Sequence, residues 1–392
     1  MYKIKCNLPG NREPWKISLE TRIQTVISAA NQGRRVAIMV YREADTSTFR
    51  YRCYNVFQIT QTGDWQSVYF FLNELEWVEK LLDTCNLLIL SRIKWSYPLN
   101  ALIKSARKRS MPVLFDVDDL ICHISYLPLL TNTLNVHFGS EEDYDFWFSY
   151  IARHQAVASQ VDGFITTNPF LGQKLSGIFN KPYQVIMNSL NVEQLDVSKT
   201  CRERKKYASS LMPFTIGYFS GTPSHINDFR MVHQELIQLL EDYPEIELKI
   251  VGYMDFPKEM QDLIQKKRVR FSPLVDFMEL QRLIAQVDVN IVPLVQNTFT
   301  NCKSELKFFE AAAVDTVTVA TPTYTYANSI QHRETGFLCS QGEWYDTIAE
   351  LYNDAELRNH IAKRAESYCL EKYAGEAFRK QVREAYNFFI AK

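Results

Sequence analysis

The chain has 392 residues, a formal net charge of −1, and 46% hydrophobic and 13% aromatic residues. This length and composition are typical of a globular protein with two or three domains. Because the charge is near zero and no basic stripe with interleaved aromatic residues is present, we expect no nucleic-acid partner. The longest apolar runs, such as residues 87–90, are strand-length and much shorter than the roughly 20 residues that cross a bilayer, so we expect no membrane span.

The eight cysteines are scattered along the chain without a Cys-x-x-Cys pair, and no signal peptide is recognisable before them. Scattered thiols of this kind are typical of a reducing compartment. We therefore predict reduced cysteines and a cytoplasmic protein, with the inner face of the membrane left open as its place of action.

The N-terminal half alternates short β-rich segments with longer amphipathic ones. The predicted strands are residues 36–40, 86–90, 113–115, 163–166 and 184–187. Such alternation predicts an α/β domain with a parallel, doubly wound sheet. Ligands of such sheets bind where the strands end, so polar residues at these ends are the first candidates for a site.

Two groups of polar residues in this half meet that criterion. Asp116, Asp118 and Asp119 follow the strand at 113–115, with His123 shortly after them, and Arg50 and Arg52 share one side of a segment that we expect to be extended. We predict that at least one of these carboxylates faces a cleft and that the two arginines meet anionic groups. Other interpretations stay open: Asp-x-Asp also occurs as a metal-binding motif, aspartates often cap helices, and paired arginines on an exposed strand are often simply solvated.

Residues 188–213 lose apolar periodicity and contain a charged run, which predicts an interdomain linker. A second alternation then begins, with strands at 214–219, 247–251, 268–271 and 289–292 and helices at 228–240 and 278–285. We predict an N-terminal Rossmann-like domain at 1–190, a linker at 191–213 and a second such domain at 214–372. A last helix, within 373–392, carries an apolar stripe that we expect to cross back onto the N-terminal domain.

Charge and polar residues are most concentrated between residues 297 and 322. Helical spacing there places Lys303, Lys307 and Glu310 on one face, with Ser304 as the expected N-cap and a buried strand at 316–321. Two lysines beside a helix N-terminus predict a diphosphate site, and the Glu310 carboxylate is suited to the vicinal hydroxyls of a ribose. An amphipathic surface helix with a Lys/Glu ladder would give a similar pattern.

The loop after the first strand of the second domain contains small residues that let backbone amides approach a phosphate. Ser220, Gly221, Thr222 and His225 are therefore candidate phosphate-binding residues, although a tight turn without a ligand is also consistent with them.

The Lys-x-x-Glu-Ala helix followed by a strand resembles the nucleotide-sugar site of the retaining glycosyltransferases of family 4, which have the GT-B fold. The resemblance covers residues 214–345 and implies that Glu310 holds the donor ribose and that Leu274 lies beside the nucleobase. It also implies that the 220–225 loop faces the donor diphosphate, and it leads us to expect Asp118, Lys303, Lys307 and Glu310 as the catalytic set. The expected acceptor-binding residues are Arg50, Arg52, Asp116, Asp119 and His123. We infer that Lys303 and Lys307, with Ser304, supply the charge that faces the diphosphate. The chain departs from the family at Cys302, where a second glutamate is usual, and in the 220–225 loop, which lacks the usual arginine and lysine.

The resemblance implies a hexosyl- or deoxyhexosyltransferase that acts with retention and without a metal or other cofactor. Its donor would be a nucleoside diphosphate sugar, and its acceptor a glycan, glycolipid or glycoprotein in the assembly of a bacterial-type surface polysaccharide or glycoconjugate. The basic run Lys104, Arg107, Lys108 and Arg109 is the basis for expecting peripheral membrane association. A sugar-nucleotide epimerase of the same fold, or a non-catalytic subunit that partners an active transferase, are the alternatives.

Overall fold

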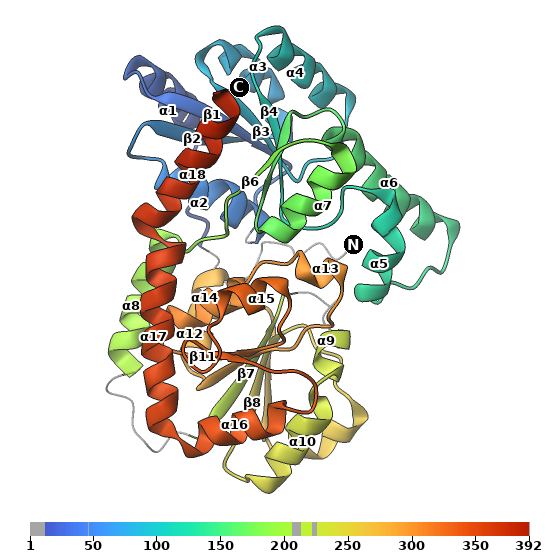
Figure 1. Ribbon diagram of the computed structural model, residues 1–392, viewed down its shortest axis with the longest axis vertical. Helices are drawn as coiled ribbons and strands as arrows, with labels where there is room; N and C mark the ends of the chain where they lie inside the picture. Colours follow the sequence, from blue (N-terminus) through green and yellow to red (C-terminus); the bar gives the residue numbers. More distant parts are fainter. Residues whose placement is uncertain (1–11, 46, 206–212, 222–225, 392) are drawn as a thin grey trace.

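The computed structural model of the chain describes residues 12–45, 47–205, 213–221 and 226–391 (Figure 1). Within these residues it contains two six-stranded sheets, one in each half of the chain, with strand orders β2-β1-β3-β4-β5-β6 and β12-β11-β10-β7-β8-β9. The strand pairs in both sheets are parallel. Helices cover the sheets, as expected for parallel strands that are buried on both faces, and the predicted doubly wound architecture is confirmed.

The strands are short and consist largely of β-branched and aromatic residues, which suit a buried pleated sheet. In the N-terminal sheet they are β1 Arg35–Tyr41, β2 Trp65–Phe71, β3 Leu87–Ser91, β4 Val113–Val117, β5 Gly163–Thr166 and β6 Tyr183–Val185. In the C-terminal sheet they are β7 Thr215–Ser220, β8 Glu247–Gly252, β9 Val269–Ser272, β10 Val289–Val292, β11 Val317–Ala320 and β12 Phe337–Leu338.

The helices that connect the strands carry their apolar residues toward the sheets. Those of the first half are α1 Leu19–Asn31, η1 Arg50–Tyr54, α2 Asn55–Ile59, η2 Leu72–Glu74, α3 Leu75–Leu81, η3 Leu82–Thr84, α4 Tyr97–Lys108, η4 Ile124–Tyr126, α5 Leu127–Thr133, α6 Glu141–Ala158, α7 Pro169–Phe179 and α8 Val192–Lys205. Those of the second half are α9 Ile226–Arg230, α10 His233–Asp242, η6 Lys258–Met260, α11 Gln261–Gln265, α12 Phe277–Ile284, α13 Thr298–Asn301, α14 Leu306–Ala312, α15 Tyr324–Ser329, α16 Trp344–Asn353, α17 Ala355–Tyr373 and α18 Gly375–Ile390.

Each sheet has one point at which the order of its strands reverses. In the N-terminal sheet this point lies between β1 and β3, and in the C-terminal sheet it lies between β7 and β10. Ligands of doubly wound sheets bind beyond the carboxyl ends of the strands at such a point. The carboxyl ends of β7 and β10 are Ser220 and Val292, so the predicted donor loop begins at the reversal of the second sheet.

The segment that we predicted as an interdomain linker forms a helix over most of its length. Helix α8 contains few apolar residues, packs against α12 of the C-terminal half, and buries Gln194 and Ser198. The sequence between the two sheets is therefore a polar helix that contacts its surroundings along its side, rather than an extended connection. The exact domain boundaries stay a prediction.

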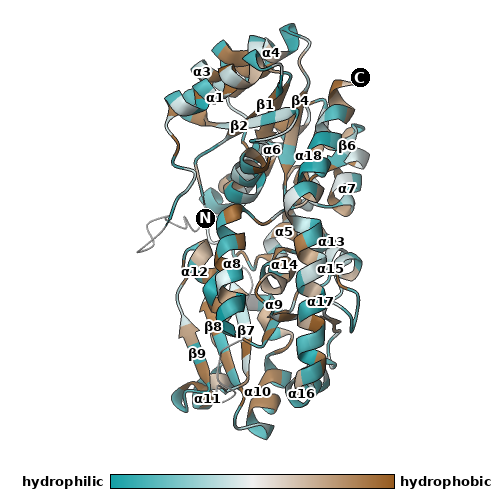
Figure 2. Cartoon of the chain, turned by 90° about the vertical axis from the view of Figure 1, so that its left-hand side faces the viewer, coloured by the Kyte–Doolittle hydropathy of each residue, from teal (hydrophilic) through white to brown (hydrophobic). Residues whose placement is uncertain are grey.

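The last helix, α18, lies against the N-terminal half, whereas α17, which leads into it, runs along the C-terminal half (Figure 1). Phe378, Val382, Tyr386 and Phe389 are buried in one hydrophobic cluster with residues of β1, β2 and β3. The Tyr386 hydroxyl lies 3.2 Å from Ser67 Oγ, and its ring packs edge-on against Trp65. Viewed from the side, α8 and α17 present mainly hydrophilic residues on the outer surface (Figure 2).

Other contacts join the two halves near the middle of the molecule. The Trp15 ring, which precedes α1, lies 5.8 Å from the ring of Phe277 at the start of α12. Asn168 Nδ2 donates to the carbonyl of Cys302 at 2.8 Å, and Asn297 Nδ2 donates to Thr133 Oγ1 at 3.0 Å. The two sheets are thus held with their carboxyl ends facing each other.

No helix in the described ranges is both long enough and apolar enough to cross a bilayer. The seven cysteines in these ranges are all free thiols.

Candidate functional site

Glu310 lies near the C-terminal end of the short helix α14, and its side chain is almost completely buried. Tyr51 Oη donates to Glu310 Oε1, and Gln194 Nε2 donates to the same oxygen at 3.2 Å. Arg50 Nη2 lies 3.5 Å from this oxygen. Tyr51 and Arg50 belong to η1, and Gln194 belongs to α8. Residues of these two elements thus meet at a carboxylate of a third, α14.

Lys307 lies one helical turn before Glu310. Its ammonium is enclosed, lies 5.4 Å from the centre of the Tyr218 ring, and has no hydrogen-bond partner among the described residues. Burial lowers the pKa of Lys307 to about 8, although Asp228 and Glu310 oppose this shift. A buried cation without a partner is costly, and an anionic ligand would remove that cost.

Lys303 is already paired across the middle of the molecule. Its Nζ lies 2.6 Å from Asp119 Oδ1 and 4.4 Å from the centre of the Phe299 ring. Asp119 follows β4 of the N-terminal sheet, whereas Lys303 follows α13 of the C-terminal half. The ion pair therefore joins the predicted acceptor side to the predicted donor side.

The three aspartates of the 116–119 segment each face a cation. Asp116 belongs to β4 itself and accepts from Arg52 Nε at 2.9 Å, while burial raises its pKa to about 6 against the effect of this arginine. Burial also opposes the charge on Asp118, but Arg92, 2.8 Å away, and the Thr48 hydroxyl outweigh it and lower its pKa. Arg92 Nη2 lies 3.2 Å from Asp119 Oδ2.

The structure corrects two expectations about Arg50 and Arg52, namely that they lie on an extended segment and that their side chains share one side of it. The segment around Arg50 and Arg52 is a helical turn, η1, and not an extended strand, and both arginines are buried instead of solvated. The two side chains also diverge, since Arg50 reaches Gln194 while Arg52 reaches Asp116 and the carbonyl of Ile186. Of the predicted acceptor-binding residues, the structure therefore brings Arg52 and Asp116 together and places Arg50 beside Glu310.

The expected N-cap at Ser304 is also wrong. Helix α14 begins at Leu306, and its N-cap residue is Glu305, whose side chain makes no capping hydrogen bond. Ser304 Oγ instead accepts from Asn188 Nδ2 at 2.9 Å. The Asn297 side chain caps a separate short helix, α13, in the segment before Ser304 that we expected to be a loop.

The remaining candidates lie at the edges of this region. Ser220 is buried at the end of β7, and Gly221 is exposed with open space where a Cβ would stand. Leu274 is partly exposed in the loop after β9, and His123 caps η4 through Nδ1, which accepts from the Ser125 amide at 3.3 Å. Thr222 and His225 lie outside the described residues.

Within the described residues, no three His, Cys, Asp or Glu side chains are grouped closely enough to hold a metal ion. This result agrees with the pairing of Asp116 and Asp118, which each face an arginine and do not converge on one point.

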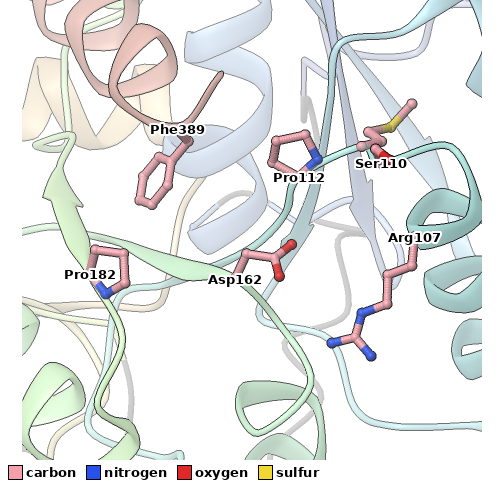
Figure 3. Close-up of a pocket in the computed structure, with 7 residues that line it drawn as sticks. Arg107, Ser110, Pro112, Asp162, Pro182 and Phe389 are labelled. Carbon is pink, nitrogen blue, oxygen red and sulfur yellow. The ribbon is translucent and has the colours of Figure 1, made fainter. Parts of the chain in front are cut away.

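Two adjoining hollows lie at the opposite end of the N-terminal sheet from these residues. The smaller has a volume of about 290 Å³ and is lined by residues that precede β4, β5 and β6 together with Phe389 of α18. Phe389 and Pro182 lie on one side and Arg107 on the other, with Asp162 between them (Figure 3). Because the hollow lies at the amino ends of the strands, it is separate from the candidate site.

The sequence did not predict the residues that contact Glu310 and Lys307. Tyr51 and Gln194 contact Glu310 across 259 and 116 residues of sequence, and no spacing pattern links them to it. Tyr218, whose ring lies near Lys307, follows the expected pattern of a buried strand and carries no further signal.

Comparisons with known proteins agree with this arrangement. Residues 213–354 match the family model of the glycosyl transferases group 1. No curated protein sequence matches the chain.

Several solved structures have a similar fold. The structure of Alr3699/HepE from Anabaena in complex with UDP and glucose has 14% sequence identity and a TM-score of 0.60, and the match covers 90% of this chain and 99% of that one. Sucrose-phosphate synthase from Thermosynechococcus elongatus, at 14% identity, matches with a TM-score of 0.58 over 91% of this chain and 100% of its own. A glycosyltransferase from Rickettsia africae, at 12% identity, matches with a TM-score of 0.59 over 92% and 99%. The chain thus has the GT-B fold of these structures, and its residues 213–354 match the family model of the glycosyl transferases group 1.

Proposed function

We propose that this protein transfers a sugar, with retention of configuration, from a uridine diphosphate sugar to a hydroxyl of a glycan, glycolipid or glycoprotein acceptor. The observation that carries the proposal is the enclosed ammonium of Lys307, which lacks a partner among the described residues and lies one turn from Glu310. Departure of the diphosphate leaves negative charge on its oxygens, and a cation held in place without water stabilises that charge.

The choice of uridine as the base rests on similarity alone. The Anabaena protein was crystallised with UDP, with UDP and glucose, and with UDP-glucose. In the same pose the ribose hydroxyls would meet Glu310. The backbone near Gly221 would border the diphosphate, and the backbone around Leu274 would border the base. A hexosyl or deoxyhexosyl group, and a role in surface polysaccharide or glycoconjugate assembly, remain parts of the proposal.

Asp118 and the residues around it form the acceptor side of the proposal. Asp118, Asp119 and Arg92 lie at the carboxyl ends of β3 and β4, near the reversal of the N-terminal sheet. An acceptor sugar would form hydrogen bonds to Asp118 and Asp119 in competition with Arg92. These hydrogen bonds would orient the incoming hydroxyl toward the donor.

The ribose contact can be tested by titrating UDP into the parent protein and the Glu310→Gln and Glu310→Ala variants. Loss of hydrogen bonds to a charged group costs about 1.5–3 kcal/mol, so we expect UDP binding to weaken by about 10- to 100-fold and sugar transfer to be abolished in Glu310→Ala. Glu305→Gln is a matched control, because this buried glutamate accepts from Tyr373 Oη and Ser329 Oγ, neither of which is a partner of Glu310. Unchanged UDP affinity in folded Glu310 variants would remove the ribose assignment.

Metal independence is tested separately with a strong chelator. We expect transfer to continue in its presence, because Lys307 supplies the positive charge that a divalent ion would otherwise supply. Loss of activity that manganese or magnesium restores would instead point to Asp116 and Asp118 as ligands.

A non-catalytic subunit is the second candidate, and Cys302 is the observation that favours it. This buried thiol occupies the position where the family usually has a glutamate, and burial raises its pKa to about 12, so it carries no charge to replace the carboxylate. Hydrolysis of UDP-sugars without an acceptor distinguishes the candidates: a transferase releases UDP slowly, whereas a binding subunit releases none.

A further inference from the structure

The contacts at Glu310 are unevenly distributed between its two oxygens. Among the described residues, Tyr51, Gln194 and Arg50 all approach Oε1, and Oε2 has no hydrogen-bond partner. One oxygen is therefore held by the protein, and the other is left for a ligand.

The groups that hold Oε1 are themselves fixed by one another. Arg50 Nη1 donates to Gln194 Oε1 at 2.6 Å, which leaves the Gln194 amide nitrogen to donate to Glu310. The Arg50 guanidinium lies 4.0 Å from the centre of the Tyr51 ring, and this ring packs edge-on against Phe309. Four side chains from η1, α8 and α14 thus form one closed network.

A glutamate carboxylate at the end of three rotatable bonds can turn freely unless its surroundings fix it. Fixing Oε1 also fixes the direction of Oε2. The conformational entropy of the Glu310 side chain is therefore lost during folding, and no further loss is needed when a ligand binds to Oε2. Burial raises the pKa of Tyr51 well above the usual range of a phenol, so the hydroxyl stays a donor at any pH used for assays.

We propose that Tyr51, Arg50 and Gln194 are positioning residues for the ribose contact of Glu310, so that the donor site in the C-terminal domain is completed by the N-terminal half and α8. The inference rests on the proposed function, because it assigns a role to these residues at the same site. Donor affinity then depends on how the two halves are placed relative to each other.

The test uses UDP and 2′,3′-dideoxy-UDP, which differ only in the two ribose hydroxyls. We expect the parent protein to bind UDP at least tenfold more tightly than the dideoxy analogue. In Tyr51→Phe this ratio should fall to less than about threefold, because the carboxylate is no longer oriented, while the affinity for the analogue changes little.

Tyr54→Phe is the matched control. Tyr54 Oη donates to Glu193 Oε1 at 2.6 Å, so this variant also removes a tyrosine–glutamate bond between η1 and α8, but away from Glu310. It should keep the ratio of the parent. Adding Tyr51→Phe to Glu310→Gln should have no further effect on the ratio, since both changes act through the same side-chain group at position 310.

The outcomes separate the inference from the proposed function. A Tyr51→Phe protein that melts at a lower temperature but keeps the full preference for UDP would overturn the inference, because the contacts would then be structural only. If Glu310→Gln also keeps the preference for UDP over the dideoxy analogue, or if the parent does not discriminate between them, the ribose assignment is wrong. The inference about Tyr51, Arg50 and Gln194 is then wrong as well.

Discussion

The ammonium of Lys307 is enclosed and has no hydrogen-bond partner among the described residues, so its charge is sensitive to pH. Its pKa is lowered to about 8, so the free protein loses this charge as the pH rises through that value. A bound diphosphate would raise the pKa again, because an anion next to the ammonium favours the charged form. Nucleotide binding must therefore take up a proton above pH 8 but not below it.

We predict that UDP affinity is constant between pH 6.5 and 7.5 and is about tenfold weaker at pH 9. Lys307→Arg is the control, because a guanidinium stays charged throughout this range and the variant also corrects for ionisation of the nucleotide itself. Calorimetric titration at each pH gives the dissociation constants. Identical pH profiles for the parent and Lys307→Arg would show that Lys307 does not meet the diphosphate.

At the scale of single residues, the sequence indicated which side chains could bind a ligand, but it did not indicate which distant residues those side chains contact. The spacing of Lys307 and Glu310 placed both on successive turns of α14, as the structure does. Local spacing carries no information on which distant residue meets a side chain, so the partners of Glu310 and the divergence of Arg50 from Arg52 were not predicted.

At the scale of elements, buried strands were the easiest to predict. The strands expected at 163–166 and 289–292 coincide with β5 and β10, because short β-branched runs between polar segments have few alternative structures. Strand β2 was not predicted, and the helix expected at 228–240 is divided into α9 and α10.

Two helical elements were misread for an identifiable reason. Helix α8 contains few apolar residues, so its sequence is typical of a linker, and only its contacts with both halves stabilise it. In η1, Phe49, Arg50, Tyr51 and Arg52 alternate between aromatic and basic residues, which favours a strand, but the tertiary contacts of the arginines override this local preference.

At the scale of the whole molecule, α18 packs against the N-terminal half, although it follows the C-terminal half in the sequence. Phe378 on this helix is 2% exposed and packs in the cluster beneath the N-terminal sheet. We predict that Phe378→Ala lowers the free energy of unfolding by about 3–5 kcal/mol, through lost burial and the cavity that remains.

Urea unfolding followed by circular dichroism measures this change. Phe388→Ala is the control on the same helix, since Phe388 is 37% exposed, and it should lower the unfolding free energy by less than about 1 kcal/mol. If the two variants unfold at the same urea concentration, the packing of α18 contributes little to the stability of the N-terminal half.

The network around Glu310 also limits how such a protein can be assembled from parts. A recombination event that joined this C-terminal domain to a foreign N-terminal domain would keep the carboxylate but lose Tyr51 and Arg50. The new chimera would bury a negative charge without its donors, at a cost of about 1–3 kcal/mol or more, before any acceptor specificity could be gained. Exchange of the N-terminal domain would therefore be expected to carry the η1 segment along, or to replace Glu310 at the same time.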